Sequence, residues 1–177
     1  TILKQAKEDN VMKQSIMYLI SALVVLGQFS HAQAAEVEVK WSNSDKYSDI
    51  DAGEEHRKHF KERTFKSFEK HFAELAASLP ENQKLILDIT DVDLAGDVNF
   101  SGIKRIRVVK SIYFPRIDFS YQLLNADNKV IKGKEVSLKD LGFLSHTGLR
   151  YRNKTLSYEK EMLDDWFRET FADDVIK

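Results

Sequence analysis

Five short stretches of the chain are predicted to be strands, either because apolar and polar residues alternate or because β-branched residues are frequent. The stretches are 36–41, 84–93, 104–113, 116–124 and 129–138. The alternation is clearest in 116–124, where one side consists of Ile117, Phe119, Tyr121 and Leu123. Such a pattern is typical of strands that bury one face and leave the other face to water.

Turn residues suggest how these strands are connected. The run Asn125-Ala126-Asp127-Asn128 has typical turn chemistry, so 116–124 and 129–138 should form a hairpin. A loop with two glycines joins 84–93 to 104–113, and we expect these two stretches to pair as a second hairpin. Phe114-Pro115 should end the strand at 113.

Two helices are predicted from apolar residues at helical spacing. The first should run from about Ala52 to Leu79, because Asp51 and Glu54 resemble an N-terminal capping box and Pro80 follows. Its apolar face consists of Phe65, Phe68, Phe72, Leu75, Ala76 and Leu79. The second should span about 157–172, with an apolar stripe of Leu156, Met162, Leu163, Trp166, Phe167 and Phe171.

The predicted order of elements, β-α-β-β-β-β-α, indicates an α+β fold. We expect a mostly antiparallel sheet of four or five strands with two helices packed on one face. The hydrophobic fraction of 42% and the charged fraction of 31% suit a globular domain and argue against global disorder. The net charge of −1 gives no overall basic field that would attract nucleic acid or anionic lipid.

The N-terminal segment has the pattern of a secretory signal peptide. Met12 and Lys13 precede an apolar run within 15–27, and Ala32-Gln33-Ala34 supplies small residues at the cleavage positions. The run is shorter than the roughly 20 residues of a membrane span, although a retained anchor or a buried helix is the alternative. We therefore expect an upstream extension at 1–11, a signal peptide at 12–34 and one periplasmic domain at 35–177. The chain has no cysteine, which excludes disulfides and a lipoprotein anchor at Ala35.

Three segments occur in an order that suggests a family. They are LILDITDVDLAGD (85–97), FPRI (114–117) and YEKEMLDDWF (158–167). Together with the signal peptide they resemble the proteobacterial exported family catalogued as domain of unknown function 3016. The likeness covers nearly all of 35–177, and Phe114-Pro115 stands where such families commonly have two prolines. The resemblance implies a periplasmic protein and brings no known activity.

The sharpest chemical feature is a run of aspartates that includes Asp91, Asp93 and Asp97. Asp91 and Asp93 should share a strand face, and pairing with 104–113 would place them opposite Arg105 and Arg107. The alternative is a Ca²⁺ or Mg²⁺ site formed by Asp91 and Asp93. The candidate binding residues are Asp91, Asp93, Asp97, Arg105, Arg107 and Arg116, and no residue is a catalytic candidate.

Other chemistries have weaker signals. His56 and His59 start a His-x-x-His pair, but His71 and His146 are too far away to complete a zinc site, so solvated histidines are favoured. The sequence has no glycine-rich phosphate loop, no G-x-S-x-G and no H-E-x-x-H, and no cofactor is expected.

Two hypotheses about function remain. The first is a non-enzymatic periplasmic binding or accessory module whose partner is an unknown protein or small ligand, with 94–103 or 139–154 as its surface. The second is a divalent-metal-dependent activity that uses Asp91 and Asp93. Neither nucleic acid nor a permanent membrane anchor is expected.

The signal peptide yields the first prediction. When a Gram-negative host exports the chain, signal peptidase should cut after Ala34, because alanines occupy positions 32 and 34. N-terminal sequencing of the exported protein should therefore begin at Ala35-Glu36-Val37. An exported protein that keeps Met12 would show that the segment is retained.

Overall fold

The computed structural model describes residues 35–100, 104–145, 151 and 154–175. The signal peptide expected at 12–34 and His146 lie outside these described residues.

A four-stranded sheet forms the centre of the domain. Its strands are β1 (Glu36–Trp41), β2 (Lys84–Asp93), β5 (Arg116–Leu124) and β6 (Val130–Lys139). They lie in the order β1-β2-β5-β6, with β1 parallel to β2 and the other neighbours antiparallel. The hairpin predicted for 116–124 and 129–138 is confirmed as β5 and β6. The sheet is mostly antiparallel, as its alternating pattern indicates.

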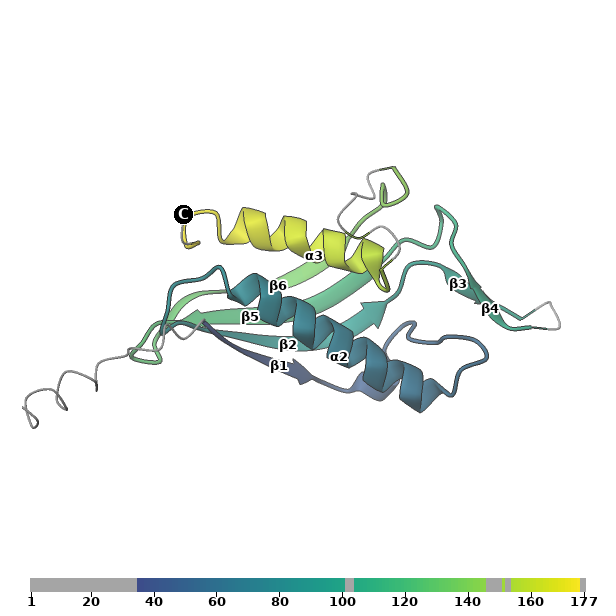
Figure 1. Cartoon of the computed structure of the whole chain (residues 1–177), viewed down its shortest axis with the longest axis horizontal. Coiled ribbons are helices and arrows are strands. Elements are labelled where there is room, and N and C mark those ends of the chain that lie inside the picture. The colour runs from purple at the N-terminus through teal and green to yellow at the C-terminus, as the bar shows by residue number, and fades with distance from the viewer. Residues whose placement is uncertain (1–34, 101–103, 146–150, 152–153, 176–177) are drawn as a thin grey trace, which may run out of the picture. The chain divides into compact units, whose positions relative to one another are not determined.

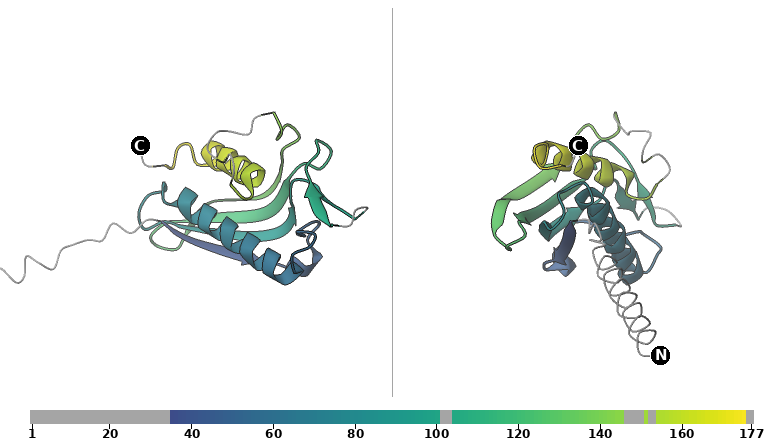
Figure 2. Two further views of the ribbon diagram at one scale, coloured as in Figure 1. Left: turned by 45° about the vertical axis from the view of Figure 1, so that its right-hand side comes forward. Right: turned by 60° about the vertical axis from the view of Figure 1, so that its left-hand side comes forward.

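Two helices, α2 (Arg57–Ala76) and α3 (Ser157–Thr170), cover the same face of this sheet (Figures 1 and 2). α2 lies along β1 and β2, and α3 lies across β5 and β6 (Figure 1). The predicted α+β class, with two helices on one face of a mostly antiparallel sheet, is confirmed. Among the described residues, no helix is both long and apolar enough to cross a membrane.

A separate two-stranded ribbon, β3 (Asp97–Asn99) and β4 (Ile106–Val108), extends from the end of the sheet (Figure 1). The prediction of one strand over 104–113 is therefore wrong in length, since only three of its residues pair. The predicted pairing of this stretch with 84–93 is wrong as well, because β5 occupies that side of β2. Local sequence patterns predict strands, but they do not say which strands become neighbours.

The first helix begins five residues later than predicted, at Arg57. Asp51 does not cap it: its Oδ1 accepts a hydrogen bond of 2.8 Å from the N–H of Gly53, within the preceding turn. Gly53 has a φ of 85°, which a helix excludes and which favours glycine. A short 3-10 helix, η1 (Ser44–Lys46), precedes this turn.

Aromatic side chains dominate the core between the sheet and the helices. Phe68 and Phe72 from α2 and Leu163 and Phe167 from α3 are buried against the sheet. Trp166 makes edge-to-face contacts with Phe119 and Tyr121 of β5, at ring-centroid distances of 4.8 and 5.5 Å. Trp166 therefore fastens α3 to the middle of the sheet, as its place on the apolar stripe predicts.

The second prediction concerns this contact. Trp166→Ala should lower the free energy of unfolding by about 3–5 kcal/mol, because it leaves a cavity under α3. Trp41→Ala is the matched control: Trp41 is only half-buried, stacked on Phe65 at 3.9 Å, so its loss should be clearly smaller. Urea melts measure both values. A loss below about 1 kcal/mol for Trp166→Ala would show that α3 contributes little to the packing.

Candidate functional site

A β-bulge in β2 decides where the acidic run points. Leu85, Leu87 and Ile89 face the core, so regular alternation would send Asp91 inward as well. The register shifts between Ile89 and Asp91, and Val92 takes the next core position. The bulge thereby turns the Asp91 side chain to the face without helices. Asp93 shares that face, as predicted.

Asp91 is held by three contacts from two neighbours, Ser48 and Arg116. The backbone N–H and the hydroxyl of Ser48 each donate to its carboxylate at 2.6 Å. Nη2 of Arg116 lies 3.3 Å from Asp91 Oδ2 and 3.6 Å from Asp93 Oδ2. The expected partners Arg105 and Arg107 are therefore wrong, because the neighbouring strand is β5 and supplies Arg116 instead.

The two carboxyls of this pair have opposite pKa shifts. Burial works to raise the pKa of Asp91, but the hydrogen bonds from Ser48 and Arg116 outweigh it, and the pKa is lowered. Burial raises the pKa of Asp93, and the attraction of Arg116 only partly offsets it. The guanidinium of Arg116 stands within reach of both carboxylates, where a divalent ion would have to bind. The described residues contain no group of three or more histidine or acidic side chains placed to hold a metal ion.

Arg107 belongs to a different network, at the base of the β3–β4 ribbon. Its guanidinium donates to the carbonyls of Asp51 at 2.6 Å and Gly96 at 2.7 Å, and to the carboxylate of Asp49 at 2.9 Å. Only 17% of the side chain is exposed. Arg107 therefore joins the ribbon to the end of β2 and to the turn before α2, and its donors are used within the fold.

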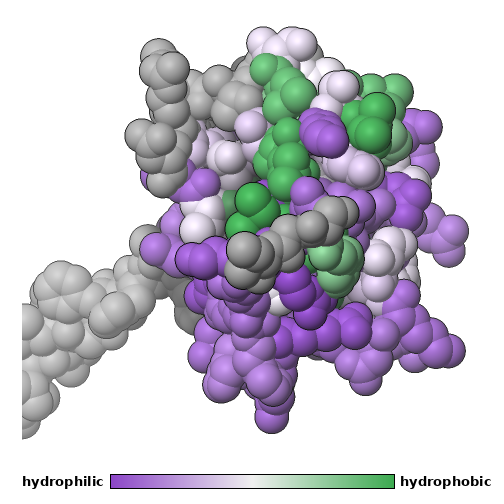
Figure 3. Space-filling model, turned by 90° about the vertical axis from the view of Figure 1, so that its right-hand side faces the viewer, coloured by the Kyte–Doolittle hydropathy of each residue, from purple (hydrophilic) through white to green (hydrophobic). Residues whose placement is uncertain are grey.

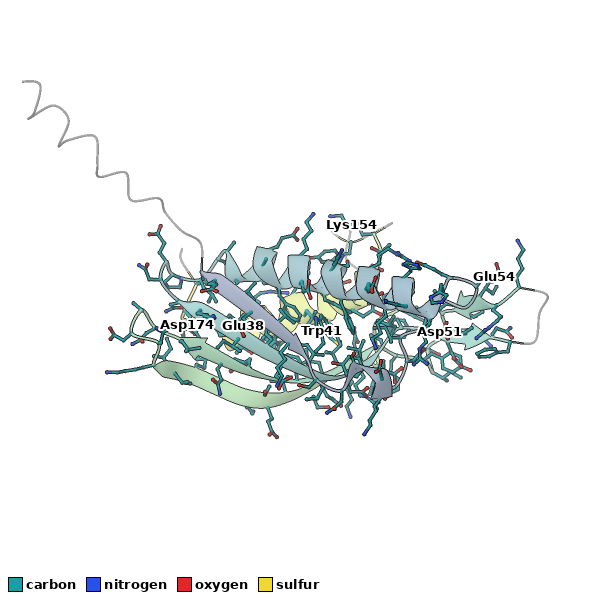
Figure 4. The ribbon with its side chains drawn as sticks, turned by 90° about the horizontal axis from the view of Figure 1, so that it is seen from below. Glu38, Trp41, Asp51, Glu54, Lys154 and Asp174 are labelled. Carbon is teal, nitrogen blue, oxygen red and sulfur yellow. The ribbon has the colours of Figure 1, made fainter. Side chains whose placement is uncertain are left out.

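Arg105 and Asp97 lie on the ribbon itself. The guanidinium of Arg105 lies over the ring of Phe100 at 4.4 Å and 3.8 Å from the carboxylate of Asp51. Asp51 and Glu54 lie at this end of the domain, beside the ribbon (Figure 4). Asp97 is exposed, and its carboxylate accepts a hydrogen bond from the N–H of Val98. The six candidate residues thus divide into an Asp91–Asp93–Arg116 cluster and a ribbon group.

A cleft of about 360 Å³ lies between α2, the end of β2 and the start of α3. Glu159, in the first turn of α3, lines this cleft, is buried and accepts a 2.8 Å hydrogen bond from the N–H of Ala95. Burial raises the pKa of this carboxyl, against the lowering effect of the Ala95 hydrogen bond. Glu159 does not stand out in the sequence, because it lies in a helix with many acidic residues. Its place three residues after the helix cap was the available signal.

The histidines are divided between solvent and core. His56 and His59 are exposed, as expected, but the expectation of solvated histidines is wrong for His71. His71 is buried between the helices, where its Nε2 lies 3.0 Å from Asp164 Oδ1 and 3.2 Å from the carbonyl of Lys160. Burial lowers its pKa, and Asp164 offsets this only in part. Because α2 packs against α3 here, this position of the helix faces a neighbour and not water.

Large apolar side chains are exposed at the ribbon end of the domain. Phe100 is 65% exposed, Ile106 55%, and Ile112, just after the ribbon, 68%. Leu141 and Leu144, in the turn after β6, are also exposed. Figure 3 faces this end and shows hydrophobic side chains gathered above a strongly hydrophilic region. We call Phe100, Ile106, Val109 and Ile112 the apolar ribbon surface. The sequence does not predict this surface, because the strand expected over 104–113 would pair with 84–93 and leave Ile106 and Ile112 half-buried.

The third prediction separates the two aspartates of the cluster. At pH 7, Asp91→Asn should lower the free energy of unfolding by about 1–2 kcal/mol, since the charged form is favoured by its hydrogen bonds. Asp93→Asn should cause no loss or a small gain, because burial disfavours its charge. The lowered pKa means that the contribution of Asp91 is complete above its ordinary value of 3.8 and disappears at more acidic pH.

Chemical denaturation at pH 7 and pH 3 measures these differences. Equal losses from the two substitutions would contradict the assignment. A melting temperature that rises by several degrees in millimolar Ca²⁺, in the wild type but not in Asp91→Asn, would instead place a divalent ion at the cluster.

The fourth prediction concerns Glu159. Its raised pKa means that the folded protein keeps a proton that the unfolded chain loses above about pH 4.5, so stability falls as the pH rises. Glu159→Gln keeps an oxygen for Ala95 but has no proton to lose. The difference in melting temperature between the variant and the wild type should therefore shift in favour of the variant by a few degrees from pH 4 to pH 8. Glu169→Gln, on the exposed side of α3, should show no such trend.

No curated protein and no solved structure gives a significant match. The family model described as "Protein of unknown function (DUF3016)" matches residues 35–169, which include all six strands and nearly all of α3. The chain therefore belongs to the DUF3016 family.

Proposed function

We propose that this protein is an exported periplasmic module that binds a partner in the cell envelope and has no catalytic activity of its own. Binding takes place through the apolar ribbon surface, at the end of the domain that also carries the turn 140–145. The signal-peptide pattern of 12–34 supports export. The family match that begins at residue 35, where the expected mature domain begins, agrees with it.

One observation carries this proposal: the exposed apolar side chains concentrate at the ribbon end. Six of the eight exposed large hydrophobic residues of the described chain belong to the apolar ribbon surface or to the turn after β6. A ribbon of two three-residue strands has little core of its own, yet Arg107 and Val98 fix it to the domain. Exposed apolar side chains on a fixed support are typical of an interaction site.

The charged residues favour binding over catalysis. Asp91 accepts from Ser48 and Arg116, Arg107 donates to the backbone and to Asp49, and Glu159 accepts from Ala95. Each group therefore has a structural role in the described part of the chain. A general acid or base would instead need a free position facing a substrate.

Photocrosslinking in an exporting bacterium tests the proposal. A photoreactive phenylalanine analogue in place of Ile112 should give covalent adducts with an envelope component, whether protein or lipid. The control places the same analogue at Ile131 of β6, which is also exposed, at 49%, but lies outside the apolar ribbon surface.

The yield of crosslinked adducts at position 112 is compared with the yield at position 131. Adducts at position 112 in clear excess over position 131, and lost in the Phe100→Ser background, are the expected result. Equal yields at both positions would mean that the ribbon end is not a binding surface.

A further inference from the structure

We propose that the apolar ribbon surface docks on an anionic phospholipid membrane. This inference rests on the proposed function for the location of the surface and adds the chemical class of its partner. Its two components are the apolar side chains that would enter the headgroup region and the cations that would face lipid phosphates. Both are found on the same short segment.

The segment 104–113 carries cations and apolar residues without any acidic residue. Lys104, Arg105 and Lys110 are exposed and stand beside Ile106, Val109 and Ile112. Neither lysine has an ion-pair partner among the described residues, whereas Arg105 is shared with Asp51 at 3.8 Å. A cation beside an anionic bilayer gains electrostatic attraction, and an apolar neighbour gains from burial at the interface.

These groups lie on the two strands of the ribbon and on the residues that directly adjoin them. Paired residues of an antiparallel ribbon point to the same side, so Val98 and Arg107 face the domain together. Asn99 and Ile106 face outward. Phe100, one residue further along, is exposed and packs under the guanidinium of Arg105. The exposed Asp97 is the one acidic side chain on the two strands.

The shape of the surface favours a membrane over a protein partner. The ribbon projects from the end of the sheet, as the views of Figures 1 and 2 agree. Its apolar side chains are individually 42–68% exposed, as on a convex edge. A protein would need a matching hollow for this edge, whereas a bilayer yields to it and offers phosphates around it.

Vesicle binding tests the inference. The protein, exported by and recovered from a Gram-negative host, is mixed with vesicles of phosphatidylcholine alone or with an equal share of phosphatidylglycerol, and the bound fraction is measured by sedimentation. Binding should require phosphatidylglycerol and should weaken as salt is raised from 0.05 to about 0.5 M. Lys104→Gln with Lys110→Gln, and separately Phe100→Ser with Ile112→Ser, should each weaken binding about tenfold or more.

Matched controls come from β6 and the turn before it. Val130→Ser with Ile131→Ser removes two other exposed apolar side chains, and Lys129→Gln with Lys134→Gln removes exposed cations. Both control variants should bind like the wild type. Melting temperatures within about 2 °C of the wild type confirm that all four variants are folded, because the changed side chains are exposed.

Three results would overturn the inference. Binding that does not depend on phosphatidylglycerol, or that the control variants lose equally, excludes the ribbon as an anionic-lipid surface. Absence of vesicle binding together with protein adducts at position 112 would assign the surface to a protein partner. In that case the proposed function would stand and the membrane inference would fall.

Discussion

The sheet buries only one of its faces, and this constraint determines most of the domain. Each central strand must send alternate residues toward α2 and α3, and the residues between them must tolerate water. Because of the extra residue in the bulge at Ile89–Asp91, apolar residues face the core and polar residues face water along the whole of β2. Without it, the Asp91 carboxylate would enter a core of leucine and aromatic side chains, where an unpaired charge is strongly unfavourable.

The sequence predicts well those features that depend on neighbouring residues. The bounds of β2 follow from its frequent apolar and β-branched residues, those of β5 from alternation, and the hairpin of β5 with β6 from the turn at 125–128. The buried place of Trp166 follows from helical spacing. In each case the physical cause is present within a short window of sequence.

The features that sequence reasoning missed depend on distant contacts. The run KRIRVVK has the composition of a strand, yet β2 pairs with β5 and not with this run. No local sequence pattern indicates which of the two strands pairs with β2. The partners of Arg107 include backbone carbonyls, whose positions exist only after folding. The helix does not begin as early as predicted because of a distant contact at Gly53. The backbone of Gly53 packs against Arg105, and a Cβ atom at this position would lie only 2.2 Å from the Arg105 carbonyl oxygen. The sequence therefore predicts which residues are candidates, but it does not predict which of them lie together in the fold.

The parallel pairing of β1 with β2 also affects how the chain folds as it is made. A parallel pair needs a crossover, here the whole of α2, so Lys40 and its partner Asp88 are 48 residues apart. A chain that emerges N-terminus first delivers β1 early and leaves it single until β2 follows. During that interval the strand is open to pairing with other nascent chains. Glu36, Glu38 and Lys40 alternate with its apolar residues, and charges in such a strand disfavour pairing of this kind.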